Sequence, residues 1–218
     1  MAEAAKTEVV SRSALRRQRE REQRYQTILS SAETLFAAKG YQGTSMEEIA
    51  DLAEVSVGTL YFYFKNKEDL LVQLLDGIGF RIREVVGSAF SRAEPSLDGF
   101  TRAGLAFFEE FCLPHPEKLA IVFREAVGRG SMVEASRKEI FEKFIADVLS
   151  ALLRLADKEG ASYKSRFSAE VMAVSIVGMY ERVAYNYLIW HDRTDDLPEI
   201  AENAVEFTVG GIEKLLAK

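Results

Sequence analysis

Residues 28–71 decide the fold, and they read ILSSAETLFAAKGYQGTSMEEIADLAEVSVGTLYFYFKNKEDLL. Apolar residues in the first part of this stretch recur at spacings of three and four, which predicts a helix that stops where Lys39 meets Gly40. Thr44 or Ser45 then caps a second helix of about two turns, with a glutamate three residues later to complete a capping box. The stretch therefore begins as two helices with a tight connection.

Two more helices follow in the same stretch. Ser56 is expected to cap a short helix over residues 57–63, and Asn66 a long one that runs from Lys67 to the region of Ser88. Two short helices joined by a tight turn and braced by a longer helix on each side form a helix-turn-helix, which seats its second short helix in the major groove of DNA. The helix over residues 57–63 is therefore the candidate recognition helix.

The outer face of this candidate recognition helix is unusually apolar. On a helical wheel Leu60 and Phe64 point together toward the core, whereas Gly58, Thr59 and Phe62 lie on the opposite face with a tyrosine on each flank. One exposed aromatic residue needs no explanation, but a group of them on a two-turn helix indicates a surface that something else covers. Duplex DNA would cover it.

Residues 28–71 resemble, without a gap, the signature block of the TetR (tetracycline repressor) family of transcription regulators. The rest of the chain matches that family only in length and helical pattern. The stretch departs from the family at Glu54, where a glycine is usual, because a left-handed backbone at this turn would strain a glutamate. The resemblance is carried by Ala32, Phe36, Gly40, Tyr41, Thr44, Ile49, Ala50, Val55, Ser56, the run Gly58-Thr59-Leu60-Tyr61, Phe64 and the pair Lys67-Glu68.

The resemblance implies which residues meet DNA. The start of the second helix would meet phosphate through unpaired N–H groups, and the start of the third would approach base edges, where a glycine permits close contact. Taken singly, the same residues have ordinary structural interpretations, such as helix caps for the serines and a solvated charge for Lys67. The expected DNA-binding set is Thr44, Ser45, Ser56, Val57, Gly58, Thr59, Tyr61, Phe62, Tyr63, Lys67, Arg21 and Arg24.

Charge is distributed unevenly along the chain. The net charge of −6 argues weakly against nucleic acid, but residues 11–25 hold six arginines against two glutamates. This concentrates positive potential at one end, where an arm would meet phosphates or the minor groove. A run of arginines is also a common way to solvate a helix face, and both interpretations stay open.

The remainder of the sequence predicts an all-α fold. Strand signals are almost absent, and prolines divide the chain into helical segments at about 96–112, 116–127, 133–158, 164–190 and 198–216. The expected organisation is a basic flexible arm (1–20), a three-helix DNA-binding domain with the helix-turn-helix (21–76), and a larger helical bundle that binds an effector and dimerises (77–218). The apolar segment 171–190 has membrane-like length but carries charges, which favours a buried helix and no membrane contact.

The larger domain carries no chemical motif. In the TetR family the last two helices form a dimer interface, and the small and apolar residues of segments 171–190 and 204–211 fit it, although the core of a monomeric bundle would look similar. The resemblance also implies a small, largely apolar effector whose binding shifts the helix that starts at Lys67. The expected ligand-binding set, each member of which is also an ordinary core candidate, is Phe107, Phe108, Phe111, Phe123, Met172, Met179, Tyr180 and Tyr185, with Glu125 or Arg182 as polar anchor.

Other classes of protein fit the sequence less well. A helical small-molecule carrier would not need an exposed glycine-threonine-tyrosine helix beside an arginine arm. An enzyme would need paired polar groups, and two histidines and one cysteine supply no credible catalytic or metal-binding set, so we expect no catalysis, metal or cofactor. The single Cys112 and the arginine-rich N-terminal region, which is unlike a secretory signal, favour a reducing cytoplasm. The sequence predicts a transcription regulator, with repression as the family habit.

Overall fold

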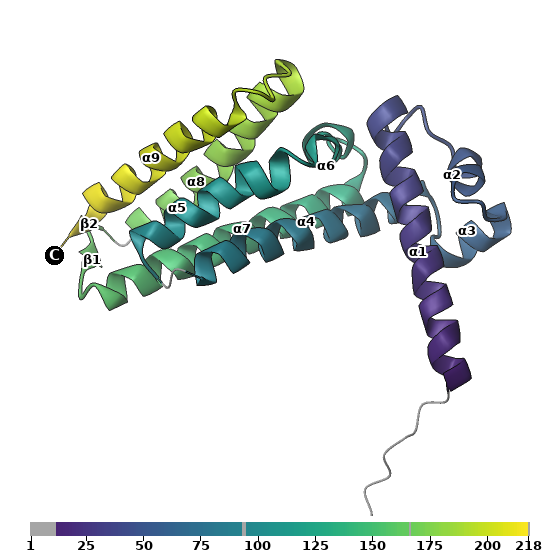
Figure 1. Cartoon of the computed structure of the whole chain (residues 1–218), viewed down its shortest axis with the longest axis horizontal. Helices are drawn as coiled ribbons and strands as arrows, with labels where there is room; N and C mark the ends of the chain where they lie inside the picture. The colour runs from purple at the N-terminus through teal and green to yellow at the C-terminus, as the bar shows by residue number, and fades with distance from the viewer. Residues whose placement is uncertain (1–11, 93–94, 166, 218) are drawn as a thin grey trace, which may run out of the picture.

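The computed structural model describes residues 12–92, 95–165 and 167–217. Within these ranges the chain is almost entirely helical, as predicted, and forms a small and a large body joined by α4 (Lys67–Ser91) (Figure 1). The small body contains α1 (Arg12–Lys39), α2 (Met46–Leu52), α3 (Val57–Tyr63) and the start of α4. The large body contains α5 (Leu97–Ala106), α6 (Pro116–Ala120), α7 (Ser131–Lys158), α8 (Ser168–Ala184) and α9 (Leu197–Leu215).

Three helices of the large body continue into π-helical stretches. These are η1 (Phe107–Cys112) after α5, η2 (Ile121–Glu125) after α6 and η3 (Tyr185–Trp190) after α8. η2 contacts α1 of the small body and α4, whereas η1 and η3 contact α6. Single π-helical turns are frequent at functional positions. A two-residue antiparallel ladder of β1 (Ser162–Tyr163) and β2 (Leu216–Ala217) was not predicted.

Helix caps and buried apolar residues form the small body as the sequence indicates. Ser45 resolves the alternative at α2, because its side chain accepts the N–H of Glu48 at 3.1 Å and the Glu48 carboxylate accepts the N–H of Ser45 at 2.9 Å. Ser56 and Asn66 cap α3 and α4. A fully buried core that includes Phe36, Ile49, Leu60, Phe64 and Leu71 then holds the helices together. The inward direction predicted for Leu60 and Phe64 is confirmed.

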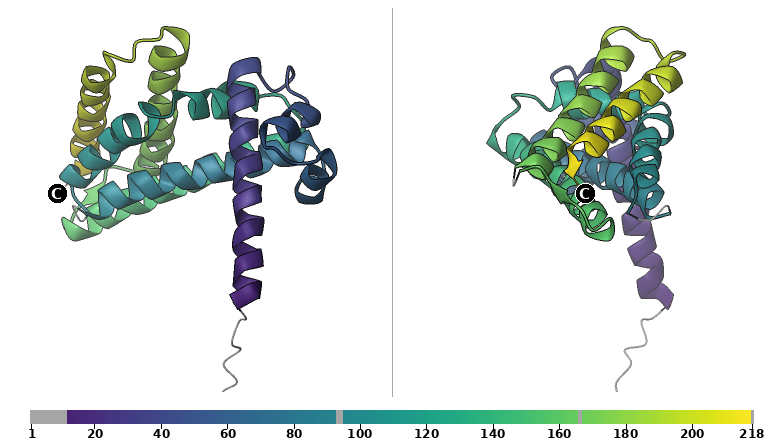
Figure 2. Two further views of the ribbon diagram at one scale, coloured as in Figure 1. Left: turned by 45° about the vertical axis from the view of Figure 1, so that its right-hand side comes forward. Right: turned by 90° about the vertical axis from the view of Figure 1, so that its left-hand side faces the viewer.

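The first helix begins earlier than the predicted arm allows. α1 starts at Arg12, so residues 12–20 are helical, whereas residues 1–11 of the predicted arm lie outside the described part of the chain. An exposed ion pair between Arg16 and Glu20, 2.7 Å apart and one helical turn along, supports the extension. The N-terminal half of α1 projects away from the other helices (Figures 1 and 2), and its arginines are exposed to solvent.

The turn between α2 and α3 contains a strained residue. Glu54 has a φ of 54°, which confirms the left-handed backbone expected at this departure from the family pattern. A side chain in this region costs roughly 1–2 kcal/mol, because its Cβ crowds the following carbonyl oxygen. The surrounding helices therefore impose a conformation that glutamate does not favour.

We expect Glu54→Gly to raise the free energy of unfolding by about 0.5–1 kcal/mol, since relief of the left-handed strain exceeds the extra backbone entropy of glycine. Urea denaturation measures this change. The matched control is Glu47→Gly in the helical backbone of α2, which should lower the free energy by roughly 1 kcal/mol. Loss of stability in both variants would contradict the assignment of strain to Glu54.

α4 ties the two bodies together without a break. It runs for 25 residues through the boundary expected between residues 76 and 77, so no linker separates the DNA-binding part from the rest. Its C-terminal half lies beside α7 and α5 in the large body, where α8 and α9 pack side by side at the outer face (Figure 2). Among the described helices, none has both the length and the apolar character to cross a bilayer.

Candidate nucleic-acid interface and internal cavity

The outer face of α3 is open to solvent. Phe62 is 70% exposed and Tyr61 48% exposed, although both are large hydrophobic residues. Gly58 is exposed too, and a Cβ built on it would approach only the Ser56 Oγ, at 3.8 Å. The fold therefore has no need of a glycine at this position. The absence of a side chain at Gly58 is explained if another molecule must come close to the backbone there.

The N-terminal end of α3 is fixed by its cap. The Ser56 Oγ accepts the N–H of Thr59 at 3.0 Å and lies 2.8 Å from the Thr59 hydroxyl. Val57 and Thr59 are half-buried beside the exposed Gly58. The predicted base-reading residues thus lie together on the first turn of α3, with their backbone held by the helix.

α1 supports the other end of α3. The Arg21 guanidinium lies over the Phe62 ring, 5.6 Å from its centroid, and Tyr25 packs against Tyr63 with ring centroids 6.3 Å apart. Tyr63 is therefore partly a packing residue. Arg24 lies elsewhere, in a shallow depression beside Glu54 and the α2–α3 turn. The structure brings Arg21 to the aromatic face of α3 but not Arg24.

Thr44 has a structural role in place of the predicted phosphate contact through its side chain. Its hydroxyl is buried, with 2% of the residue exposed, and lies 2.9 Å from the backbone oxygen of Gly40 and 3.3 Å from that of Leu35. The hydroxyl thereby closes the α1–α2 turn. Ser45, which is half-buried at the start of α2, remains in a position to meet phosphate.

Lys67 is held inside the protein. Its ammonium group donates to the backbone oxygens of Tyr41 at 2.8 Å and Thr44 at 2.7 Å, and it lies 4.5 Å from the centroid of the Tyr41 ring. Burial and the nearby Arg129 charge lower the pKa of Lys67. Two of its three protons are used to fix the α1–α2 turn on α4, which differs from the predicted role at the DNA backbone.

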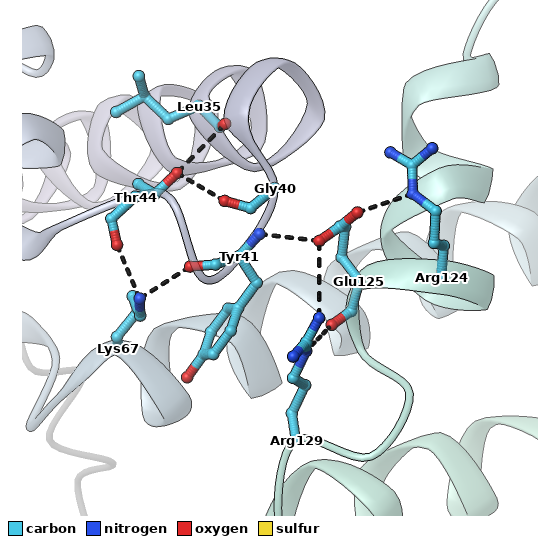
Figure 3. Close-up of polar contacts among 8 residues, drawn as sticks. All are labelled: Leu35, Gly40, Tyr41, Thr44, Lys67, Arg124, Glu125 and Arg129. Carbon is cyan, nitrogen blue, oxygen red and sulfur yellow. Dashed lines mark hydrogen bonds and ion pairs between the residues drawn. The ribbon is translucent and has the colours of Figure 1, made fainter.

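Glu125 binds the same turn from the large body (Figure 3). Its carboxylate is buried and accepts the N–H of Tyr41 at 2.8 Å and the Nε–H of Arg124 at 2.7 Å. Arg129 donates to the Glu125 backbone oxygen at 2.7 Å and lies over the Tyr41 ring. Glu125 was predicted, as an alternative to Arg182, to be the polar anchor of a ligand; in the structure it joins η2 of the large body to the α1–α2 turn.

A cavity of about 500 Å³ lies between the helices of the large body. Its wall is mainly aromatic and aliphatic, which suits an apolar ligand. α4 contributes a large share of this wall, so one helix touches both the cavity and the small body. The lining residues are Ile82, Arg83, Val86, Gly87, Phe90, Ser91, Phe100, Ala103, Gly104, Phe107, Phe123, Phe141, Phe144, Asp147, Val148, Ser150, Ala151, Arg154, Ile176, Val177, Tyr180, Glu181 and Thr208.

Three of the predicted ligand-binding residues line this cavity, namely Phe107, Phe123 and Tyr180. Burial raises the pKa of Tyr180 to about 12, while a hydrogen bond with Thr208 acts in the opposite direction, so its hydroxyl stays protonated at neutral pH. The other members lie elsewhere because they pack in the core, as Phe108, Phe111, Met172 and Met179 do, or join a cluster around Trp190, as Tyr185 and Arg182 do.

The outer face of α8 and α9 is apolar and exposed. Val171 is 60%, Val174 54% and Phe207 74% exposed, and the exposed glycines Gly178 and Gly210 lie on the same two helices. A built Cβ on either glycine would meet nothing within 4 Å. Exposed apolar residues in such number on two neighbouring helices indicate a surface that another protein covers.

Known proteins match both the helix-turn-helix and the whole fold. The family model described as bacterial regulatory proteins, tetR family, matches residues 28–74. The regulator YhgD of Bacillus subtilis is 30% identical over 139 residues, which span 63% of this chain and 71% of that protein. The fatty acid metabolism regulator of the same organism is 25% identical over 87% of this chain and 95% of its own length. The regulator YuxN of the same organism is 23% identical over 86% of this chain, which spans 63% of that protein's length.

The fold is also shared with solved structures. FadR from Bacillus subtilis in complex with stearoyl-CoA superposes with a TM-score of 0.74 over 86% of this chain and 98% of that one, at 20% identity. The exposed recognition helix on a helical bundle defines a helix-turn-helix transcription regulator. The chain belongs to the tetR family of bacterial regulatory proteins.

Proposed function

We propose that this protein represses transcription by binding operator DNA through α3, and that a small, largely apolar effector in the cavity releases it. The observation that carries the proposal is the open first turn of α3, where Gly58 has no structural reason to lack a side chain. Val57, Gly58 and Thr59 approach base edges, where a methyl group meets the methyl of thymine. Ser45, Tyr61, Phe62 and the arginines Arg21 and Arg24 contact sugar and phosphate.

Dimerisation through α8 and α9 is part of the proposal. A second copy would cover the exposed face that includes Val171, Val174 and Phe207. Twofold symmetry would then place two copies of α3 about 34–36 Å apart, which is one turn of DNA. The operator is accordingly a pair of half-sites in inverted orientation.

α4 is the element that connects effector to operator. Six of its residues between Ile82 and Ser91 line the cavity, while Lys67 at its first turn holds the α1–α2 turn through two hydrogen bonds. An effector that binds more tightly when α4 is in one of two positions shifts the population toward that position. The coupling free energy between effector and operator binding is then typically 1–3 kcal/mol. A displacement of α4 carries α3 with it and moves the paired recognition helices out of register.

A long aliphatic molecule suits the apolar cavity. The FadR structure with the same fold holds stearoyl-CoA, and the fatty acid metabolism regulator resembles this chain over most of its length. Both support a lipid-derived effector here. The same proposal includes a cytoplasmic location, where Cys112 stays reduced, and a role without catalysis. It also divides the chain into a DNA-binding part before about residue 77 and an effector-binding part after it.

Footprinting on the intergenic DNA upstream of the gene, with a salt titration, tests the proposal. We expect a protected inverted repeat and an affinity that falls steeply with salt. Phe62→Ala should weaken binding about 10-fold on all sequences because it removes backbone contacts. Phe80→Ala is the matched control: Phe80 is 69% exposed on α4, against 70% for Phe62, and the variant should bind like the parent.

Two outcomes would contradict the proposal. Equal losses in Phe62→Ala and Phe80→Ala would show that α3 is not the reading helix. Absence of any protected region at low salt would favour the alternative of a helical carrier that binds small molecules without DNA.

A further inference from the structure

An ion pair bridges the rim of the cavity. The Arg83 guanidinium on α4 donates to both carboxylate oxygens of Asp147 on α7, at 2.5 and 2.9 Å. Both residues line the cavity, and their side chains are 38% and 51% exposed. The planar guanidinium fork binds a carboxylate or a phosphate with the same two parallel bonds. Arg83 therefore already binds an anionic group supplied by the protein itself.

A second arginine lies two turns further along α7. Arg154 lines the cavity, follows Asp147 by seven residues and so projects from the same face of the helix. Its guanidinium lies 5.8 Å from the centroid of the Phe90 ring, and no carboxylate pairs with it in the described part of the chain. Ser91 and Ser150 line the cavity in the same region. The seam between α4 and α7 thus gathers both arginines of the wall together with two of its serines.

The rest of the wall has a different character. The side away from the seam is aromatic and aliphatic, with Phe100, Phe107 and Ile176. Its acidic residue is Glu181 on α8; burial raises the pKa of Glu181, whereas the charges of Arg182 and Arg137 act in the opposite direction. Both arginines of the wall lie at the seam, so an anionic group of a ligand is favoured there.

We propose that the α4–α7 seam is a headgroup subsite, in which Arg83 and Arg154 bind the carboxylate or phosphate of an amphipathic ligand while its aliphatic chain fills the apolar cavity. The ligand anion takes the place of Asp147 on Arg83. This inference rests on the proposed function, because it specifies the chemical class of the effector. It also ties binding to movement, since the exchange removes a direct bond between α4 and α7.

Calorimetry with matched probes below their micellar concentrations tests the subsite. The probes are dodecanoate, lauroyl-CoA and neutral dodecan-1-ol, which share a chain of twelve carbons and differ in the head. We expect dodecanoate or lauroyl-CoA to bind about 10-fold or more tightly than the alcohol, as charge-assisted hydrogen bonds do. Preference for dodecanoate identifies a carboxylate head, and preference for lauroyl-CoA identifies phosphate.

Variants locate the effect. Arg83→Gln and Arg154→Gln should each lower the affinity for the anionic probe about 10-fold and leave the affinity for the alcohol unchanged. Asp147→Asn should raise the affinity for the anionic probe several-fold, because it frees Arg83. Arg102→Gln is the matched control, because Arg102 is an exposed arginine paired with Asp98 on its own helix, outside the cavity wall. Thermal melts report whether each variant folds.

The outcomes separate this inference from the proposed function. The headgroup subsite is overturned if the alcohol and the anions bind with equal affinity, or if neither arginine variant changes the affinity for the anions. Operator binding would still stand. No binding of either anionic probe overturns it too. If the parent protein protects no DNA in the footprint, the proposed function as a DNA-binding regulator is overturned instead, whatever the cavity binds.

Discussion

Operator affinity is expected to fall at least about 100-fold when Gly58 is replaced by glutamate, because a buried like charge at an interface costs several kcal/mol. The substitution puts a carboxylate on the first turn of α3, where the proposal places the edge of a base pair. The fold should tolerate it, since a Cβ at Gly58 meets only the Ser56 Oγ at 3.8 Å. Fluorescence anisotropy with the footprinted duplex measures the loss.

Two further glycine variants make the result specific. Gly58→Ala should stabilise the fold by about 0.5 kcal/mol, because alanine favours the helix, yet weaken operator binding about 10-fold. These opposite signs separate a functional glycine from a structural one. Gly77→Glu adds the same charge to an exposed glycine of α4 that has nothing within 4 Å of a built Cβ, and it should bind nearly like the parent. Unchanged affinity in Gly58→Glu would remove α3 from the interface.

The recognition helix was predictable because its signals are local. Ser56 fixes where α3 begins, and the spacing of Leu60 and Phe64 fixes which side is buried, so both ends and the open face follow from eight or nine neighbouring residues. Each of these properties depends on the chain within one or two helical turns. The left-handed backbone at Glu54 was expected from the resemblance instead, because the family usually has a glycine at this position.

The junction between the bodies was not predictable, because its contacts join distant residues. Glu125 lies 84 residues from its partner Tyr41, and in the sequence it resembles any charged residue near a helix end. Lys67 looks like a solvated charge until the fold places the α1–α2 turn above it, 23 to 26 residues earlier in the chain. Sequence periodicity gives the side of a helix that is buried but not the group that it meets.

The cavity shows the same limit. Phe107 and Phe108 are adjacent in the sequence and both buried, yet only Phe107 lines the cavity. An apolar pattern cannot distinguish a wall of a cavity from a contact with another helix. The contribution of α4 was missed because its leucines and isoleucines predict a single buried stripe, whereas the stripe meets the small body at Leu71 and the cavity at Ile82.

Loss of the Glu125 carboxylate is the second large effect that we expect. Glu125→Ala should lower the free energy of unfolding by about 2–3 kcal/mol, because it leaves the N–H of Tyr41 without its acceptor and takes a carboxylate from between two arginines. Glu125→Gln, which keeps an oxygen for Tyr41 but no charge, should lose less. Glu139→Ala is the control, because Glu139 pairs with Lys143 on an exposed face of α7, where such pairs contribute about 0.3–0.5 kcal/mol.

A specific readout distinguishes a joint between the two bodies from ordinary core stabilisation. If Glu125 holds the α1–α2 turn against the large body, its removal should first free that turn, since Lys67 then holds it from α4 alone. Amide hydrogen exchange of Gly40, whose N–H keeps its acceptor on Phe36 in the variant, should therefore accelerate more than that of Leu60 and Phe108, which lie in the cores on either side. Uniform acceleration at all three amides would show that Glu125 stabilises the fold as a whole and does not act as the joint through which α4 and η2 hold the DNA-binding body.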